Sequence, residues 1–467
     1  MELYRKNILI VGLGVSGVSA ARFAKGKGGF VTITDIEKED ALAAYLREIR
    51  KMGIKTELGQ HRIDTFETAD LIVVSPGVPH TILPLKRARE KGIPILGELE
   101  LASRYIREPI AAVSGTNGKT TTTRLLGRML ENSGFNVFVG GNIGNPLIDY
   151  VAEEKTADIV VAEVSSFQLD TIDTFRPHVS VLLNISEDHL DRYPSFDAYV
   201  RSKGRIFKNQ TESDTAVING SDPYILSISK TIKARKLAFY HQQGQVDDRH
   251  KEYALIKPRD GMQPPGIEFF TNEELKGFLD LSTVGLLGRH NMENAAAAAL
   301  ASLAAGGNMG GIQSALNDFK GLSHRLEFVE VINGVHFYDD SKGTNIDAVA
   351  RALEVFDTPV ILIMGGRDKG GDYKHLRELM RSHAKKLIVM GEAGSMIKSA
   401  LEDVCQEGAQ TASGMEDAVQ SAYLSAVPGD IVLLSPGCSS FDMYQNYAQR
   451  GEAFCRAVEN LTRKIRN

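Results

Sequence analysis

Residues 110–120 of this 467-residue chain, Ile-Ala-Ala-Val-Ser-Gly-Thr-Asn-Gly-Lys-Thr, decide its fold. An apolar run, Ile110–Val113, meets a glycine-rich stretch that opens a helical pattern. This order predicts a strand, a tight loop and a helix whose first N–H groups cradle phosphates. We expect Lys119 to reach the β- and γ-phosphates of a nucleotide, and Thr120 to hold Mg²⁺.

The loop departs from the common phosphate-loop pattern, which has glycine at the position that Val113 occupies here. The Gly118-Lys119-Thr120 sequence between strand and helix nevertheless favours a nucleoside triphosphate. The alternative at this point is a glycine turn with an incidental lysine.

A second glycine cluster, Gly12-Leu13-Gly14-Val15-Ser16-Gly17, lies near the start of the chain. It has the G-x-G-x-x-G spacing, it follows the apolar run 7–11, and Asp35 ends the next expected strand at the usual distance. The cluster predicts a nucleotide-diphosphate site and does not specify NAD. A turn that only packs helix against strand is the alternative.

Short β-branched runs alternate with helical patterns almost from end to end, which predicts an α/β protein with parallel sheets. At about 150 residues per domain, the length fits three domains. We expect a Rossmann-like N-terminal domain over 1–95, a central phosphate-loop domain over 96–322 and a Rossmann-like C-terminal α/β domain over 323–467.

Several elements are expected inside these domains. A short linker helix is predicted over 97–108, and hairpins and loops at a sheet edge over 240–285. An alanine-rich helix is predicted over 291–305, and a tight hairpin turn at Asn333-Gly334. A long helix is predicted from about 441 to 464, capped by Ser439 or Ser440.

Composition narrows the class of protein. Apolar residues make up 43% of the chain, with 44 glycines besides, so wholesale disorder is excluded. The net charge of −5 with mixed signs argues against a nucleic-acid partner. The three cysteines, 405, 438 and 455, lack metal-ligand spacing and suit a reducing cytosol. Since no apolar stretch of about 18 residues occurs, we expect a cytoplasmic protein without a membrane span.

Polar residues follow other predicted strands. Glu163 and His189 come after apolar runs, so both are expected at the sheet edge of the phosphate loop, where they could hold cations. Taken alone, Glu163 could equally be a solvated carboxylate, and His189 could be a hydrogen-bonded surface histidine. Four later clusters mix basic, hydroxyl and acidic groups, which suit phosphate and carboxylate ligands. The alternative is that they are only capped turns. The clusters are 323–325, 339–345, 365–369 and 435–442.

Lys203 lies in a helical pattern over 196–207. Its local sequence predicts an ordinary solvated charge on a helix surface.

These motifs, in this order, resemble the Mur ligases, ATP-dependent ligases that join amino acids to the peptidoglycan precursor. The resemblance spans essentially the whole chain. The loop with Gly115, Gly118 and Lys119 is similar to the family's own form of the phosphate loop. The Rossmann-like start and the segments 163–169 and 339–345 most resemble the branch that adds D-glutamate to UDP-N-acetylmuramoyl-L-alanine.

The resemblance implies an acyl-phosphate mechanism. ATP would phosphorylate the carboxylate of UDP-N-acetylmuramoyl-L-alanine, and the D-glutamate amine would displace phosphate to form the amide. Two Mg²⁺ sites are implied, one with Thr120 and Glu163 and a second with His189. Lys203 matches the family's carbamylated lysine, whose anionic carbamate would help place the second ion.

The resemblance also assigns ligand contacts residue by residue. ATP would be held by Gly115, Thr116, Asn117, Gly118, Lys119, Thr120, Thr121, Asn291, Asn294, Arg325, Asp368 and Lys369. The UDP substrate would be held by Gly14, Val15, Ser16, Asp35, Ser75, Pro76, Gly77, Asn142 and His189. D-glutamate would be held by Lys342, Thr344, Ser440, Phe441 and Tyr447. Catalytic roles fall to Lys119, His189 and Lys203, in a monomer whose third domain would close over the central one.

Three other functions stay open on the sequence. The first glycine cluster alone would suit an NAD-dependent oxidoreductase. The phosphate loop alone would suit a nucleotide-driven switch. The motifs together would also suit a sister ligase, either another Mur enzyme or one similar to folylpolyglutamate synthase.

Overall fold

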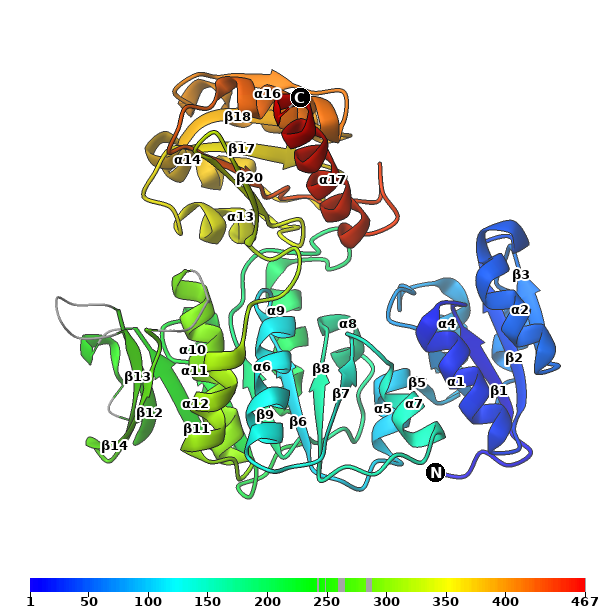
Figure 1. The fold of residues 1–467 in the computed structure, drawn as a ribbon. Coiled ribbons are helices and arrows are strands. Elements are labelled where there is room, and N and C mark those ends of the chain that lie inside the picture. Colours follow the sequence, from blue (N-terminus) through cyan, green and yellow to red (C-terminus); the bar gives the residue numbers. More distant parts are fainter. Residues whose placement is uncertain (242, 248, 259–264, 283–287, 467) are drawn as a thin grey trace. The chain divides into compact units, whose positions relative to one another are not determined.

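The computed structural model describes residues 1–241, 243–247, 249–258, 265–282 and 288–466. The chain divides into two compact units. The first consists of Met1–Asn184, Tyr199–Ser282 and Asn294–Leu316, and the second of Ile185–Ala198, Thr283–Glu293 and Asn317–Asn467. Three sheets flanked by helices make up these units, as the α/β prediction requires (Figure 1).

The N-terminal sheet is parallel throughout and has the strand order β3-β2-β1-β4-β5. Its strands are β1 (Asn7–Val11), β2 (Phe30–Asp35), β3 (Lys55–Leu58), β4 (Leu71–Val74) and β5 (Ile95–Gly97). Its helices are α1 (Val15–Gly26), α2 (Ala43–Lys51), α3 (Ile63–Glu67) and α4 (Leu83–Glu90). The strand order reverses between β1 and β4, the point where open parallel sheets bind ligands. The Rossmann-like prediction is confirmed.

The central sheet has the order β14-β13-β12-β11-β10-β9-β6-β8-β7. Its strands are β6 (Ile110–Ser114), β7 (Val137–Gly141), β8 (Ile159–Glu163), β9 (Val179–Leu182), β10 (Thr215–Asn219), β11 (Arg235–Tyr240), β12 (Glu252–Lys257), β13 (Gly266–Thr271) and β14 (Glu274–Asp280). Among the described strands of this sheet, only the pairs β12–β13 and β13–β14 are antiparallel, so the predicted edge hairpins are present. Part of that prediction, 259–264, lies outside the described residues.

Eight helices lie along the same part of the described chain. They are α5 (Glu98–Ser103), α6 (Lys119–Asn132), α7 (Leu147–Ala152), α8 (Ser166–Leu169), α9 (Phe196–Gly204), α10 (Pro223–Ser229), α11 (Arg289–Ala304) and α12 (Met309–Asp318). The linker helix α5 is shorter than predicted. The alanine-rich helix is confirmed in α11.

The third sheet, in the second unit, has the order β15-β16-β20-β17-β18-β19, with only β15 antiparallel. Its strands are β15 (Glu327–Ile332), β16 (Val335–Asp339), β17 (Val360–Gly365), β18 (Ala384–Met390), β19 (Ala409–Thr411) and β20 (Ile431–Leu434). Its helices are α13 (Ile346–Leu353), α14 (Arg377–His383), α15 (Gly394–Leu401), α16 (Met415–Ser425) and α17 (Tyr447–Arg466). Two apolar clusters cover opposite faces, one built with α13 to α15 and one with α16 and α17 (Figure 1).

The hairpin between β15 and β16 turns where the sequence predicts. Asn333 and Gly334 have φ of +51° and +82°. Positive φ at both central residues is the signature of a type I′ turn, whose twist matches the flanking strands.

The last helix begins later than predicted. Residue 439 is held in extended backbone, because its N–H donates to the Arg367 carbonyl at 3.0 Å and its own carbonyl accepts from the Arg367 N–H at 2.9 Å. The next residues turn instead of entering the helix, and α17 starts only at Tyr447. Neither Ser439 nor Ser440 is therefore the cap of α17.

Two further expectations concern the class of protein. Within the part of the chain that the structure describes, every helix is too short or too polar to cross a membrane. Cys405, Cys438 and Cys455 are free thiols, the first two of them buried.

Candidate active site

The phosphate loop joins β6 to α6. Gly115 and Gly118 have φ of +152° and +84°, a conformation that glycine adopts without the penalty of a Cβ atom. Lys119 folds back over the loop, where its Nζ donates to the carbonyls of Gly115 at 2.9 Å and Thr116 at 2.7 Å. The ammonium and the first turn of α6 thus converge on one loop, as phosphate binding requires.

Glu163 meets this loop at the carboxyl end of the neighbouring strand. Strand β6 lies beside β8, with Val113 opposite Glu163. Glu163 is only 2% exposed, and its two oxygens accept from Thr120 Oγ1 at 2.8 Å and Asn142 Nδ2 at 2.9 Å. A hydroxyl and a carboxylate are the hard oxygen ligands that Mg²⁺ prefers. The structure therefore brings together the two residues predicted for the first Mg²⁺ site, with Asn142 beside them.

Lys203 is not the solvated charge that its local sequence predicts. It is 1% exposed, and its Nζ donates to the Gly115 carbonyl at 2.6 Å. The same Nζ lies 4.7 Å from the ring centroid of Tyr199, whose hydroxyl is 3.1 Å from Thr116 Oγ1. The side of α9 with these two residues packs against the phosphate loop, and the loop's carbonyl draws the ammonium inward. Its carbamylation stays a prediction.

Asn294 of α11 touches the phosphate loop. A Cβ added to Gly118 would lie 2.1 Å from Asn294 Oδ1. The same oxygen accepts from Thr122 Oγ1 at 3.3 Å. Asn294 thus lies beside the phosphate loop, and its contact with ATP stays a prediction, whereas Asn291 belongs to the second unit.

The N-terminal glycine loop is held by two of its predicted ligand residues. Asp35 Oδ2 accepts from the Leu13 N–H at 2.6 Å, and Ser75 Oγ donates to the Gly12 carbonyl at 3.1 Å. A Cβ on Gly17 would lie 2.0 Å from the Gly12 oxygen, so only glycine permits this contact between helix and strand. The loop meets the requirements of a diphosphate site, and contacts of Asp35 and Ser75 with substrate stay predictions.

His189 belongs to the second unit, in the segment 185–198 that follows β9. Its φ is +56°, and its Nε2 lies 3.5 Å from Asp188 Oδ2. The backbone N–H of His189 also donates to Asp188 Oδ1 at 2.9 Å. The Asp188 carboxylate thus fixes the histidine, whose predicted role as a metal ligand stays untested by these contacts.

The same carboxylate joins residues predicted for two different ligands. Asp188 Oδ1 accepts from Lys369 Nζ at 3.2 Å, and Oδ2 from Asn345 Nδ2 at 3.3 Å. Lys369 Nζ also lies 3.4 Å from Thr344 Oγ1. Lys369, predicted for ATP, and Thr344, predicted for D-glutamate, are therefore neighbours. The sequence motifs contain Asp188 and Asn345, yet neither was predicted as a site residue.

Lys342 and Tyr447, both predicted for D-glutamate, lie together in the second unit. Lys342 Nζ is 3.7 Å from the Tyr447 ring centroid, a cation–π contact. Ser440 is buried, whereas Phe441 is 64% exposed. The aromatic ring of Phe441 is thus available at the surface of the loop that precedes α17.

Asp368, predicted for ATP, is fixed by a residue that the sequence did not single out. Its Oδ1 accepts from the Tyr373 hydroxyl at 2.7 Å, and this hydroxyl lies 3.1 Å from Cys438 Sγ. Burial raises the pKa of the Cys438 thiol to about 11, so the thiol stays protonated at neutral pH.

Asp340 lies beneath the Lys342 loop. Its Oδ2 accepts from Ser435 Oγ at 2.8 Å. Burial raises the pKa of Asp340 to about 7, while the Ser435 hydrogen bond and the nearby charge of Arg325 act in the opposite direction. Arg325, predicted for ATP, therefore lies close enough to influence this carboxyl.

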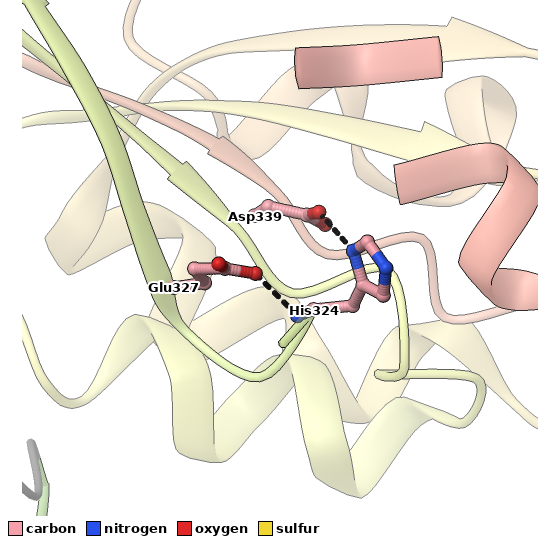
Figure 2. Close-up of side chains that lie close together, drawn as sticks. All are labelled: His324, Glu327 and Asp339. Atoms are coloured by element: carbon pink, nitrogen blue, oxygen red, sulfur yellow. Dashed lines mark hydrogen bonds and ion pairs between the residues drawn. The ribbon is translucent and has the colours of Figure 1, made fainter. Parts of the chain in front are cut away.

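His324, next to Arg325, is held by two carboxylates (Figure 2). Its Nδ1 lies 2.7 Å from Asp339 Oδ2, and its backbone N–H donates to Glu327 Oε2 at 2.7 Å. Their possible metal-ligand atoms lie within 4.8 Å of one another. We interpret the cluster as a structural hydrogen-bonded triad, because the ring nitrogen and the Asp339 oxygen are already paired with each other. It fixes the backbone that presents Arg325.

Three family profiles match successive parts of the chain. The Mur ligase MurD-like N-terminal domain matches residues 6–97, the Mur ligase middle domain 113–302, and the Mur ligase glutamate ligase domain 324–438. Together they cover most of its length and correspond to the three sheets.

Curated relatives match the chain over nearly its whole length. A protein of Desulfosudis oleivorans named UDP-N-acetylmuramoylalanine–D-glutamate ligase is 50% identical over 461 residues, which is 99% of this chain and 98% of that protein. A protein of the same name from Desulfatibacillum aliphaticivorans is 50% identical over 464 residues, 99% and 100% of the two chains.

Solved structures share the fold at lower identity. A pseudomurein peptide ligase type C from Methanothermus fervidus superposes with a TM-score of 0.62 at 20% identity, over 98% of this chain and 100% of that one. A MurF ligase from Thermotoga maritima in complex with ADP gives a TM-score of 0.60 at 18% identity, over 99% and 96%. With matched profiles along the chain and relatives at 50% identity, this chain belongs to the Mur ligase family.

Proposed function

We propose that this chain is an ATP-dependent ligase that adds D-glutamate to UDP-N-acetylmuramoyl-L-alanine during peptidoglycan precursor synthesis. The relatives that carry this activity in their names match it at up to 50% identity from end to end. The geometric support is one juxtaposition: Lys119, Thr120 and Glu163 meet at the carboxyl ends of β6 and β8.

The residues fit phosphoryl transfer to a carboxylate, which needs positioning and charge neutralisation more than covalent catalysis. Lys119 would stabilise charge on the β- and γ-phosphates from its place over the loop. Thr120 and Glu163 would hold Mg²⁺, which neutralises phosphate charge when bound. Asn142, hydrogen-bonded to Glu163, would contact the UDP substrate next to this group.

The second Mg²⁺ site belongs to this proposal. His189 would be one of its ligands, and a carbamate on Lys203 would supply negative charge nearby. The burial of Lys203 at the phosphate loop supports such a role, since a carbamate retains one N–H for the Gly115 carbonyl and adds a carboxylate.

The second unit would bind the amino acid and part of ATP. Lys342, Thr344, Ser440, Phe441 and Tyr447 would hold D-glutamate, and Arg325, Asp368 and Lys369 would serve ATP. We further propose that the three domains span residues 1–95, 96–322 and 323–467. The third domain would close on ligand binding and exclude water. The protein would be a cytoplasmic monomer.

The test is phosphate release. Purified protein is incubated with ATP, Mg²⁺ and UDP-N-acetylmuramoyl-L-alanine, and each of a panel of amino acids is added in turn. Release that depends on D-glutamate is expected. Release with L-lysine, diaminopimelate or L-alanine in its place would refute the proposal, and nicotinamide binding would revive the oxidoreductase.

A further inference from the structure

Glu98, the first residue of α5, carries a buried carboxyl. The residue is 2% exposed, and its Oε1 accepts from the Ile148 N–H at 2.7 Å. The backbone of Leu147 also donates to this carboxyl, and Oε2 has no hydrogen-bond partner among the described residues. Desolvating a carboxyl is costly unless hydrogen bonds compensate. Both compensating bonds of Glu98 come from the first turn of α7.

Helix α7 is held on another side by the N-terminal domain. Asp149 Oδ2 accepts from Ser19 Oγ at 3.0 Å, and Oδ1 lies 3.3 Å from the Arg22 guanidinium. Both partners lie on α1, which starts at Val15 directly after the glycine loop. Helix α7 thus connects the linker helix to the helix that opens the proposed UDP site.

The turn before α7 leads to the proposed metal site. The Gly141 N–H donates to the Asn145 carbonyl at 2.9 Å, which closes a tight turn around Asn142. Asn142 itself bonds Glu163 twice, through its backbone N–H at 2.9 Å and its Nδ2 at 2.9 Å. Because only a few residues join Asn142 to Leu147, we expect a shift in the start of α7 to displace Asn142.

We propose that Glu98 is a positioning residue for the UDP substrate: by fixing the first turn of α7, it sets Asn142 against Glu163 and against the N-terminal glycine loop. This inference rests on the proposed function, in which these two places hold opposite ends of one substrate. A displacement of about 1 Å in a group that positions a substrate is enough to weaken productive binding strongly.

The test compares Glu98→Leu with Glu98→Gln. Leucine fills the buried volume and preserves the fold, but leaves the Ile148 N–H unpaired. Glutamine keeps an oxygen that accepts the same N–H. We expect Glu98→Leu to raise the KM for UDP-N-acetylmuramoyl-L-alanine about tenfold, which corresponds to roughly the free energy of one hydrogen bond. The KM for ATP should change less than about twofold, and Glu98→Gln should restore the substrate KM.

Glu100 provides the matched control, since it is the other buried carboxyl of α5 and is 0% exposed. It accepts from the backbone N–H groups of Thr174 and Phe175 and from Arg104 Nε, away from α7. Glu100→Leu should lower the melting temperature and leave the substrate KM unchanged. Equal KM changes in the two leucine variants, or a glutamine variant that behaves like leucine, would overturn the inference.

Calorimetric titration with UDP-N-acetylmuramoyl-L-alanine separates this inference from the proposed function. If the wild-type chain binds this compound without D-glutamate-dependent phosphate release, the proposed function fails. The ratio of affinities between wild type and Glu98→Leu then still decides the role of Glu98: a roughly tenfold loss supports it, and no loss overturns it.

Discussion

The Arg450 guanidinium bonds both the side chain and the backbone of Ser341. Nε donates to Ser341 Oγ at 3.0 Å, and Nη2 donates to the Ser341 carbonyl at 2.9 Å. Two further bonds reach the carbonyls of Gly365 at 3.2 Å and Cys438 at 3.1 Å. One side chain of α17 therefore joins three loops, and each of these loops carries residues proposed to bind ATP or D-glutamate.

Replacing Arg450 should destabilise the second unit. Arg450 is 1% exposed, so Arg450→Leu would leave several buried carbonyls without donors, at a cost of about 3–5 kcal/mol in the free energy of unfolding. Urea unfolding measures the loss. Arg456→Leu on the exposed side of the same helix is the control, with a change expected below about 0.5 kcal/mol. Equal effects of the two variants would contradict the prediction.

Gly118→Ala should weaken ATP binding. Its Cβ would meet Asn294 Oδ1 at 2.1 Å, in addition to the strain of φ +84°. Gly134→Ala has the same kind of backbone strain, φ +99°, with open space around the new atom. We expect Gly134→Ala to lose about 1–2 kcal/mol of stability and Gly118→Ala to lose at least as much. The Kd for ATP, measured by calorimetry, should rise at least about tenfold only for Gly118→Ala. An unchanged Kd there would refute the proposed contact of the loop with phosphates.

Lys203 variants separate a carbamate from a plain ammonium. Lys203→Ala should lower kcat about 10- to 100-fold, as loss of a group that orients a metal does, and acetate should restore part of the phosphate release. Lys203→Arg keeps the positive charge but forms no carbamate, so it should be as inactive as Lys203→Ala. Full activity of Lys203→Arg would instead show that a cation suffices.

The pair His324–Asp339 should make stability depend on pH. The hydrogen bond to Asp339 raises the pKa of His324 above its ordinary value of 6.5. Since the folded state favours the protonated ring, this stabilisation is complete below about pH 6.5 and is lost as the pH rises through the raised pKa. The stability advantage of wild type over Asp339→Asn, about 1–2 kcal/mol at low pH, should therefore shrink toward pH 9 or so in urea titrations. A constant difference would show that the pair contributes no pH dependence.

The glycine loops could be predicted because their chemistry is local. Particular residues at fixed spacing are needed in both loops. One opens a helix at Gly118-Lys119, and in the other Gly17 lies close to the Gly12 carbonyl. The same holds for the turn at Asn333-Gly334. In each case the backbone conformation is fixed by neighbouring residues along the chain, so the sequence alone indicates it.

Tertiary contacts were harder to predict. Nothing around Lys203 in the sequence indicates that a carbonyl from residue 115 draws it into the interior. The delayed start of α17 depends on pairing between Ser439 and Arg367, which no local pattern reveals. Arg450 and Tyr373 were missed for the same reason, because their partners lie on distant loops. For Arg450 the signal to search for is a charged side chain at the helical spacing of apolar residues, here Phe454, Ala457 and Val458 of α17.

The linker helix α5 limits how this chain can be divided or recombined. A cut after residue 97 would separate Gly97 from a helix whose carboxyls already serve α7 and the segment 173–175. If the N-terminal domain were replaced by that of a relative, Asp149 would lose its hydrogen-bond partners Ser19 and Arg22. Exchange of substrate-binding modules between relatives therefore requires α1, α5 and α7 to be inherited together, although α1 and α7 are separated by more than a hundred positions in the sequence.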